Sequence, residues 1–366
     1  MFIYLGIMPF LFKQYNMDAV TFGYWMSAFA FLTLLSSPIL GRIADIFGSR
    51  TVLILSMLSA SAAHFLMGSA TGIPMLLLSR GVSLLMDIMP SAQMAVTDLV
   101  PEADRGRYLG KIMIPMSAGM IIGPTLGGTL SKYLGSQGTL MLTWIAPLVC
   151  IFIIMTFIPS VPKTKKSDNT KEQTKGGIDW SRLGQFFQGD IPYLFVMRIL
   201  TTLPGMIFMM NFQLAGINFF KLTPQGNGMI VSCLGIFNMF NNGVTMPYIA
   251  KKLHQDQLIK WTPLLSVATY FSLSQVTEVW QLILVLYFIN LCYAVMENQI
   301  MTRLTKSVDS SATSTMVGLA TALFHFSRTV SPTVGGILMN QYGWPAIGQL
   351  GFAVSIVMAT MSIVKH

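Results

Sequence analysis

Ionisable and amide side chains inside long apolar stretches carry the most specific chemistry in this sequence. The residues that we assign to a substrate and proton pathway are Arg80, Asp87, Arg198, Asn238, His325 and Arg328. A charged group inside a bilayer is costly, so it is expected to serve a function or to be paired. A carboxylate near a mobile cationic partner can take up and release a proton. The alternative is a set of structural ion pairs that hold helices together.

Two of these residues are expected on one face of a helix. Arg80 and Asp87 are seven residues apart, which is about two turns of an α-helix. Arg198 and Arg328, with His325 one turn earlier, would face them from the second half of the chain. Asn238 belongs to a group of asparagines that would line the same pathway or form bonds between helices.

The elements that position these side chains must be transmembrane helices. Hydrophobic residues make up 53% of the sequence and charged residues 10%, with a mean hydropathy of +0.62. Soluble proteins carry about 25% charged residues, so this chain lacks the side chains to cover a water-facing surface. The stretch 141–158 does not alternate between polar and apolar residues, which argues against a β-barrel. The prediction is an all-α polytopic membrane protein.

A hydrocarbon core needs roughly 20 apolar residues per helix, which leaves room for about a dozen spans. The expected full spans are 20–40, 50–70, 73–97, 108–130, 140–158, 191–214, 226–249, 258–273, 279–302, 314–339 and 344–364. The stretch Met1–Phe12 is too short for one. We expect it to be the second half of a truncated first helix, in a chain that begins late.

Charge divides the chain into three parts. The segment 160–188 is polar and rich in lysine, so it is expected to link an N-terminal bundle, 1–159, to a C-terminal bundle, 189–366. Most of the 23 Lys and Arg residues lie on the side of the membrane that holds this linker and the C-terminus. The opposite side has only Lys13, Lys132 and Lys221. The asymmetry predicts that the linker and the C-terminus are cytoplasmic.

An internal repeat relates the two bundles. The sequence Gly-Pro-Thr-Leu-Gly-Gly at 123–128 recurs as Ser-Pro-Thr-Val-Gly-Gly at 331–336, an offset of 208 residues. At the same offset Gly110 matches Gly318, and Gly135 matches Gly343. Parallel repeats of six helices are one way in which secondary transporters are built. The alternative is chance recurrence in glycine-rich helices.

A ten-residue segment after the second helix resembles the signature loop of the major facilitator superfamily. The matching residues are Gly41, Asp45, Gly48 and Arg50, whereas Ser49 stands where that pattern has a basic residue. The resemblance implies a latch in which Asp45 joins the two halves on the cytoplasmic side through a helix N-terminus. An ordinary solvated turn is the alternative.

The repeated glycines resemble a motif of the drug–proton antiporter branch of that superfamily. They are Gly119, Gly123, Pro124, Gly127 and Gly128 in the fifth helix, with Pro332, Gly335 and Gly336 in the eleventh. Small residues four apart allow helices to pack closely in lipid. The motif and plain close packing do not exclude each other.

Longer patches at 90–99, 126–130 and 328–336 resemble organic-cation-transporter-like members of solute carrier family 22. This resemblance implies a polyspecific organic cation carrier, coupled to protons, in the plasma membrane or an internal membrane. Coupling through Asp87 is not part of the resemblance. The three arginines in apolar stretches favour an anionic or neutral substrate instead, so both alternatives stay open.

The expected partners are a small organic solute, protons and the lipid bilayer. No cofactor, metal or nucleic acid is expected. No nucleophile elbow, phosphate loop or metal-binding spacing indicates an enzyme. The alternative from another class is a non-transporting membrane scaffold or receptor that has kept a transporter fold.

Overall fold

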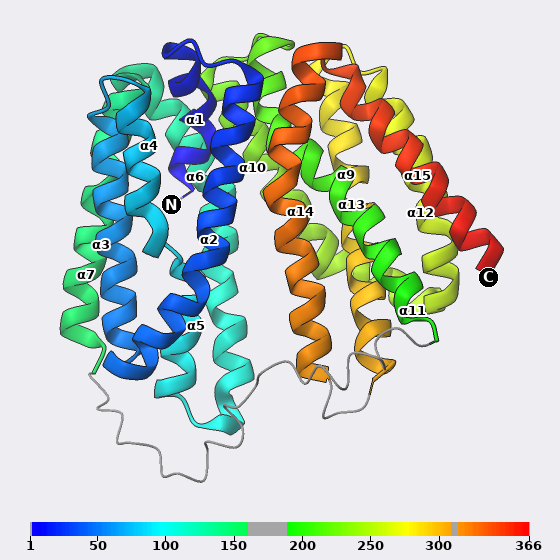
Figure 1. Ribbon diagram of the computed structural model, residues 1–366, viewed down its shortest axis with the longest axis horizontal. Coiled ribbons are helices and arrows are strands. Elements are labelled where there is room, and N and C mark those ends of the chain that lie inside the picture. Colours follow the sequence, from blue (N-terminus) through cyan, green and yellow to red (C-terminus); the bar gives the residue numbers. More distant parts are fainter. Residues whose placement is uncertain (1, 160–188, 309–312, 366) are drawn as a thin grey trace. The chain divides into compact units, whose positions relative to one another are not determined.

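The computed structural model describes residues 2–159, 189–308 and 313–365, and all regular secondary structure in these ranges is helical (Figure 1). The predicted linker 160–188 lies outside the described residues. The helices are α1 (Ile3–Gln14), α2 (Ala19–Phe47), α3 (Ser49–Gly68), α4 (Ile73–Val82), η1 (Ser83–Leu85), α5 (Ile88–Leu99), α6 (Glu102–Thr143), α7 (Ile145–Phe157), α9 (Ile191–Asn218), α10 (Pro224–Phe240), η4 (Asn241–Thr245), α11 (Met246–Lys252), α12 (Gln255–Ser274), α13 (Val279–Lys306), α14 (Thr313–Tyr342) and α15 (Pro345–Lys365).

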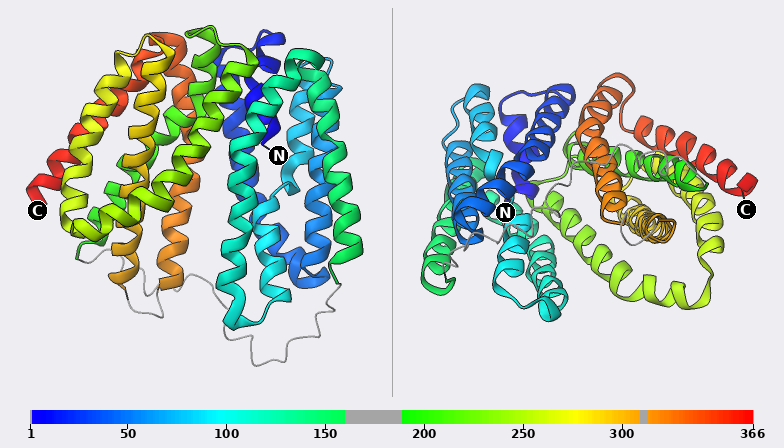
Figure 2. Two further views of the ribbon diagram at one scale, coloured as in Figure 1. Left: turned by 180° about the vertical axis from the view of Figure 1, so that it is seen from behind. Right: turned by 60° about the horizontal axis from the view of Figure 1, so that its bottom comes forward.

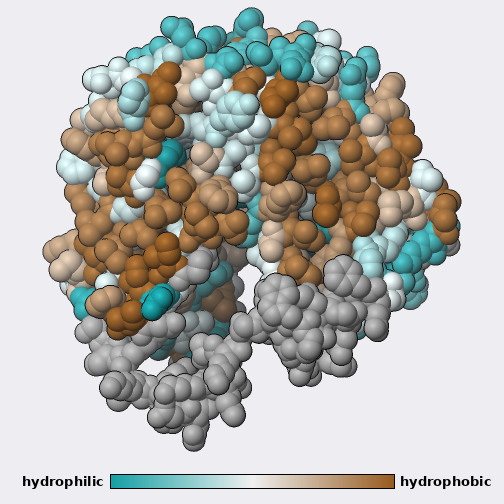
Figure 3. Space-filling model, in the orientation of Figure 1, coloured by the Kyte–Doolittle hydropathy of each residue, from teal (hydrophilic) through white to brown (hydrophobic). Residues whose placement is uncertain are grey.

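Eight stretches among the described residues are long and apolar enough to cross a membrane. They are Ala19–Ala44, Ser49–Gly68, Ile73–Leu99, Arg107–Phe157, Ile191–Asn218, Pro224–Ile249, Val279–Lys306 and Pro345–Lys365. The stretch Arg107–Phe157 covers two of the expected spans, whereas α12 and α14 reach the length but are more polar. Figure 3 shows apolar side chains along the flanks of the helices and hydrophilic ones at their upper ends. The predicted all-α membrane fold is confirmed.

The described residues form two compact units. The first comprises 2–17, 28–159 and 222–232, and the second 18–27, 189–221 and 233–365. In the first unit α3 packs against α4, α5, α6 and α7, while α1 lies along α6. In the second unit α12 and α15 run side by side, and α9 packs against α13, α14 and α15 (Figure 2). Each unit is therefore a helical bundle with its own core.

The fourth expected span is not one continuous helix. α4 ends at Val82, a short 3₁₀ turn follows, and α5 begins after Asp87. Asp87 is the N-cap residue of α5, with φ −109° and ψ 79°. The prediction that Arg80 and Asp87 share one helix face by their spacing is therefore wrong, because the helical period is interrupted between them.

Two repeat-related glycines end helical segments in the same way. Gly135 has a φ of 70° inside α6, and Gly343 has a φ of 78° between α14 and α15. A side chain disfavours this left-handed region, which glycine enters freely. The structure thus has a change of helix direction at both copies of the repeat, between the fifth and sixth and between the eleventh and twelfth expected spans.

Candidate functional site

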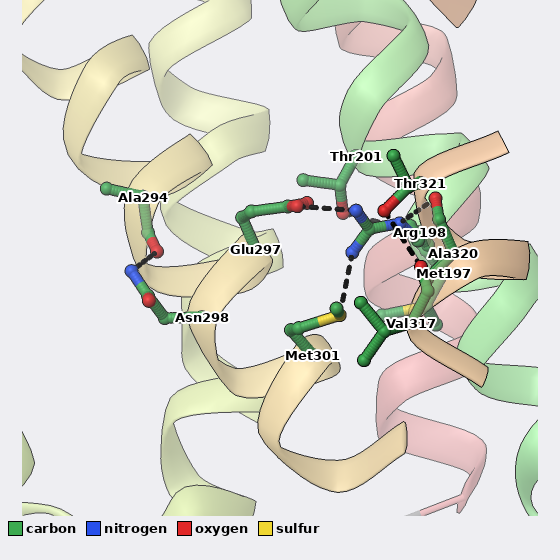
Figure 4. Close-up of polar contacts among 10 residues, drawn as sticks. All are labelled: Met197, Arg198, Thr201, Ala294, Glu297, Asn298, Met301, Val317, Ala320 and Thr321. Carbon is green, nitrogen blue, oxygen red and sulfur yellow. Dashed lines mark hydrogen bonds and ion pairs between the residues drawn. The ribbon is translucent and has the colours of Figure 1, made fainter. Parts of the chain in front are cut away.

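The second unit contains an ion pair between a buried arginine and a half-buried glutamate, where three helices meet (Figure 4). Arg198 of α9 is 3% exposed, and its Nη2 lies 2.6 Å from Oε1 of Glu297 in α13. The Nε of Arg198 donates to the backbone carbonyl of Ala320 in α14 at 3.1 Å, and Nη1 lies 3.9 Å from the sulfur of Met301. One guanidinium therefore joins three helices.

The carboxylate of this pair is only half satisfied. Oε2 of Glu297 is buried and has no hydrogen-bond partner among the described residues. An unpaired carboxylate oxygen in a buried site is a candidate for binding a proton or a cation. The sequence places Glu297 in the tenth expected span, but its pairing with Arg198, 99 residues away, was not predicted.

Arg80, the candidate in the first unit, lies in a different environment. It is 5% exposed, its Nη2 lies 2.8 Å from the sulfur of Met67, and its guanidinium lies 4.7 Å from the ring centroid of Phe29. Tyr4 and His64, with ring centroids 5.9 Å apart, line the same small cavity. The cavity has no room for a water molecule. Arg80 is thus enclosed by thioether and aromatic groups.

Asp87 lies at the break between α4 and α5. Its backbone carbonyl accepts a hydrogen bond from the hydroxyl of Ser91 at 2.7 Å, and the hydroxyls of Ser91 and Ser56 lie 2.8 Å apart. These bonds tie the start of α5 to α3. A carboxylate at a helix N-terminus is favourably placed against the helix dipole. An interrupted membrane helix is also a common place for ion and substrate sites.

The asparagine cluster is divided between two environments. Asn238 is exposed, and both its backbone carbonyl and its Oδ1 accept bonds from Asn242, at 2.9 and 2.7 Å. Asn241 is fully buried in the π-helical turn η4, and its Nδ2 donates to Oδ1 of Asn290 in α13 at 2.9 Å. π-helical turns within helices often mark functional sites. Asn290 was not predicted, because nothing in its local sequence distinguishes it.

His325 and Arg328 lie on α14 and are half-buried. The ring of His325 packs edge-on against Phe324, with centroids 5.6 Å apart. The backbone carbonyl of His325 accepts the hydroxyl hydrogen bond of Thr329 at 2.9 Å. The structure therefore places His325 and Arg328 in the same helix whose Ala320 carbonyl binds Arg198.

The predicted latch segment is more helical than expected. α2 continues through Gly41 and ends at Phe47, so the chain turns only at Gly48, whose φ is 83°. Among the described residues, no atom beyond the adjoining helix backbone lies within 4 Å of the Cβ position at Gly41. Arg50 donates to the backbone carbonyl of Met155 at 2.6 Å, within the first unit. The side chain of Asp45 lies outside the described part of the structure, so its latch role stays a prediction.

The glycines of α6 form a contact face in the first unit. A Cβ at Gly123 would lie 2.6 Å from Cβ of Phe2, and one at Gly127 would overlap the backbone oxygen of Ile3. Gly128 meets the backbone of Pro224 at the start of α10 in the same way. At Gly119 only the Phe2 ring would be displaced. This face therefore lets the backbones of α1 and α10 approach α6.

Pro124 and Pro332 have equivalent neighbours in the two units. The carbonyl of Pro124 lies against Gly228 of α10, and that of Pro332 against Gly23 of α2. Gly336 packs against the backbone of Ala19. Gly335 packs against the side-chain amide of Asn211, whose Nδ2 donates to the backbone carbonyl of Ile207 at 2.8 Å. The glycine partners, Gly23 and Gly228, are separated by 205 residues.

A second repeat, with an offset of 205 residues, was missed in the sequence. The hydroxyls of Thr125 and Ser232 lie 2.8 Å apart in the first unit, and those of Thr333 and Ser27 also lie 2.8 Å apart in the second. The segment Gly23–Ser27 has the same Gly-x-x-x-Ser pattern as Gly228–Ser232. That spacing was the signal that would have revealed these partners of the proline–glycine motif.

The Thr333–Ser27 contact should contribute measurable stability. In a double-mutant cycle of Thr333→Val and Ser27→Ala, we expect a coupling of about 0.6 kcal/mol, typical of hydrogen bonds between membrane helices. Denaturation in mixed micelles measures it. Thr321→Val is the matched control, because the Thr321 hydroxyl bonds within its own helix, to Val317 at 2.8 Å, and should be additive with Ser27→Ala. Additivity in the Thr333 cycle would contradict the assignment.

Comparisons with known proteins agree with this architecture. The family model of the Major Facilitator Superfamily matches residues 1–328. Human solute carrier family 67 member A1 is 29% identical over 97% of this chain and 86% of its own length, and rat solute carrier family 22 member 18 is 29% identical over 98% and 88%. The solved structure of the nucleoside transporter NupG aligns with a TM-score of 0.78 at 15% identity, over 99% of this chain and 95% of that one. This chain, an integral multi-pass membrane protein, therefore belongs to the Major Facilitator Superfamily.

Proposed function

We propose that the protein is a secondary active transporter that exchanges small organic solutes for protons by alternating access. Organic cations are the substrate class that we favour. The observation that carries this proposal is the free carboxylate oxygen of Glu297 beside Arg198. A proton or a cationic solute can bind at this oxygen, but not both at once, so the two compete for it. Such competition is what an exchange of organic cations for protons requires.

Carriage of organic anions or neutral solutes is the second candidate, favoured by arginines in the apolar stretches. Two observations weaken it at two of the three arginines. Arg198 is paired with Glu297, and the cavity at Arg80 has no room for a water molecule. Arg328, half-buried on α14, is the arginine on which the second candidate rests.

The proposal also covers the orientation of the chain in the membrane and the boundaries of its two helical bundles. The distribution of Lys and Arg supports a cytoplasmic C-terminus and a cytoplasmic segment 160–188. That segment would connect bundles at 1–159 and 189–366. Asp45 would then lie on the cytoplasmic side, where the proposed latch acts. The positions of single-cysteine variants, labelled from one side of the membrane, test this topology.

Uptake into proteoliposomes tests the function. Vesicles with an acidic interior should accumulate tetraethylammonium, because protons leave as the cation enters. An aromatic carboxylate and a nucleoside serve as the anionic and neutral probes under the same gradient. Accumulation of the carboxylate instead of the cation would favour the second candidate. If none of the three enters, with or without a gradient, the scaffold or receptor alternative replaces transport.

A further inference from the structure

An amphipathic groove lies on an exposed flank of the second unit, between α12 and α13. It encloses about 560 Å³, which falls within the size range of small-molecule sites. Leu265 and Phe271 of α12 and Trp280 and Phe288 of α13 are among its lining residues, and all four are exposed. Large apolar side chains exposed on a membrane-spanning bundle face hydrocarbon, so the occupant comes from the bilayer.

The polar residues of the groove gather where α12 ends and α13 begins. Gln275 is the C-cap residue of α12, and Gln281 lies in the first turn of α13. Oε1 of Gln281 accepts the backbone N–H groups of Thr277 and Glu278 at 3.0 and 3.2 Å, which leaves its amide N–H groups as donors. Gln275 donates to Ser274 at 3.2 Å, which leaves its oxygen as an acceptor. A donor and an acceptor together match a hydroxyl group.

Charge excludes an anionic head group at this end. Among the described residues that line the groove, none is Lys or Arg, and the neighbouring Glu278 is acidic. Phosphate head groups are recognised by clusters of basic side chains, which the groove lacks. A neutral hydroxyl meets no such conflict.

The rest of the groove suits a flat and rigid apolar body. The Phe271 ring packs against Phe352, with centroids 5.4 Å apart, and the Phe288 ring packs against Tyr287, also at 5.4 Å. Val285 and Val276, 7% and 4% exposed, lie at the bottom of the groove. Aromatic faces favour a planar ring system over a flexible chain, because a rigid ligand loses less conformational freedom on binding.

We propose that this groove binds one membrane sterol, with its hydroxyl between Gln275 and Gln281 and its ring system between Phe271 and Phe288. The site is independent of the proposed exchange of solute and protons. Its occupant would pack α12 against α13, the helix that carries Glu297.

Photolabelling tests the site in the full chain. The purified protein in phosphatidylcholine nanodiscs is irradiated with a diazirine derivative of cholesterol, with and without excess unlabelled cholesterol. Labelled peptides are then mapped by mass spectrometry. We expect labelling of α12 and α13 that cholesterol competes away. Ala268→Phe, which fills the exposed groove from α12, should weaken labelling roughly tenfold, a loss of about 1.4 kcal/mol of binding energy.

Ala353→Phe is the matched control, because Ala353 is exposed on α15 of the same unit and does not line the groove; its labelling should stay at the wild-type level. Gln275→Leu supplies a second test that leaves the groove open, and it should also weaken labelling. Equal labelling in Ala268→Phe, Gln275→Leu and the wild type overturns the proposal. So does labelling of α12 and α13 that excess unlabelled cholesterol leaves unchanged, which would show that the groove does not select a sterol over the surrounding phosphatidylcholine.

Discussion

Glu297→Gln should abolish pH-driven accumulation of an organic cation and should make cation binding weak and independent of pH. Glutamine keeps the shape of the side chain and an oxygen for Arg198, but it cannot take up a proton. For one-to-one exchange, a gradient of one pH unit supports about tenfold accumulation, since one unit corresponds to about 1.4 kcal/mol. The variant should reduce this ratio to about one. Uptake into proteoliposomes with an acidic interior, and binding titrations between acidic and neutral pH, measure both effects.

Glu278→Gln is the matched control, because Glu278 is an exposed carboxylate at the start of the same helix, α13. It should leave both properties unchanged. Asp87→Asn tests the other candidate carboxylate, at the break between α4 and α5. Driven accumulation that persists in Glu297→Gln would remove Glu297 as the proton site. Loss of driven accumulation in Asp87→Asn alone would place the proton site in the first unit.

Removal of the Glu297 charge is also expected to change the stability of the protein, and this effect serves as a check. Arg198 is 3% exposed, and a buried charge that loses its partner destabilises a protein strongly. Glu297→Asp keeps the charge and should retain pH-dependent binding if the shorter side chain still reaches the guanidinium. Thermal melting of both variants in detergent separates a folding defect from a loss of coupling.

Gly127→Ala and Gly336→Ala should each lower the thermal stability of the protein and reduce its folded yield. The Cβ of alanine would overlap the backbone oxygen of Ile3 at the first position and that of Ala19 at the second. A backbone atom cannot rotate away as a side chain does, so the helices must separate. Overpacking of this kind costs about 1–3 kcal/mol. Fluorescence-detected size-exclusion chromatography after heating measures the loss.

The repeat provides a matched control for this experiment. Gly110 and Gly318 are helical and are related by the same 208-residue offset. In the part of the chain that the structure describes, no atom beyond their own stretch of helix backbone lies within 4 Å of their Cβ positions. Gly110→Ala and Gly318→Ala should therefore be neutral or slightly stabilising, because alanine favours helix more than glycine does. Equal destabilisation by all four substitutions would show that glycine supplies backbone flexibility here and not close approach.

Several features of the site were predictable because they depend on local sequence. The close-packing glycines of α6 and α14 were predicted from the four-residue spacing of small residues, and the fold from the length and apolarity of the helical stretches. The expectation for Arg80 and Asp87 was wrong because an uninterrupted period was assumed where the chain forms a 3₁₀ turn. Gly81 in the last turn of α4 and Pro90 in the first turn of α5 were the sequence signals of this interruption, because a proline has no N–H for a hydrogen bond to the preceding turn.

The amino-acid sequence alone determined that this protein is a bundle of membrane helices with a duplicated proline–glycine motif, because lipid leaves a spanning chain only internal backbone hydrogen bonds to make. Tertiary structure alone decided which polar side chains meet. Arg198 finds Glu297, Asn241 finds Asn290, and Thr333 finds Ser27 across 306 residues. Such pairings depend on the rotation and depth of each helix against its neighbours, and no period along a single helix specifies them.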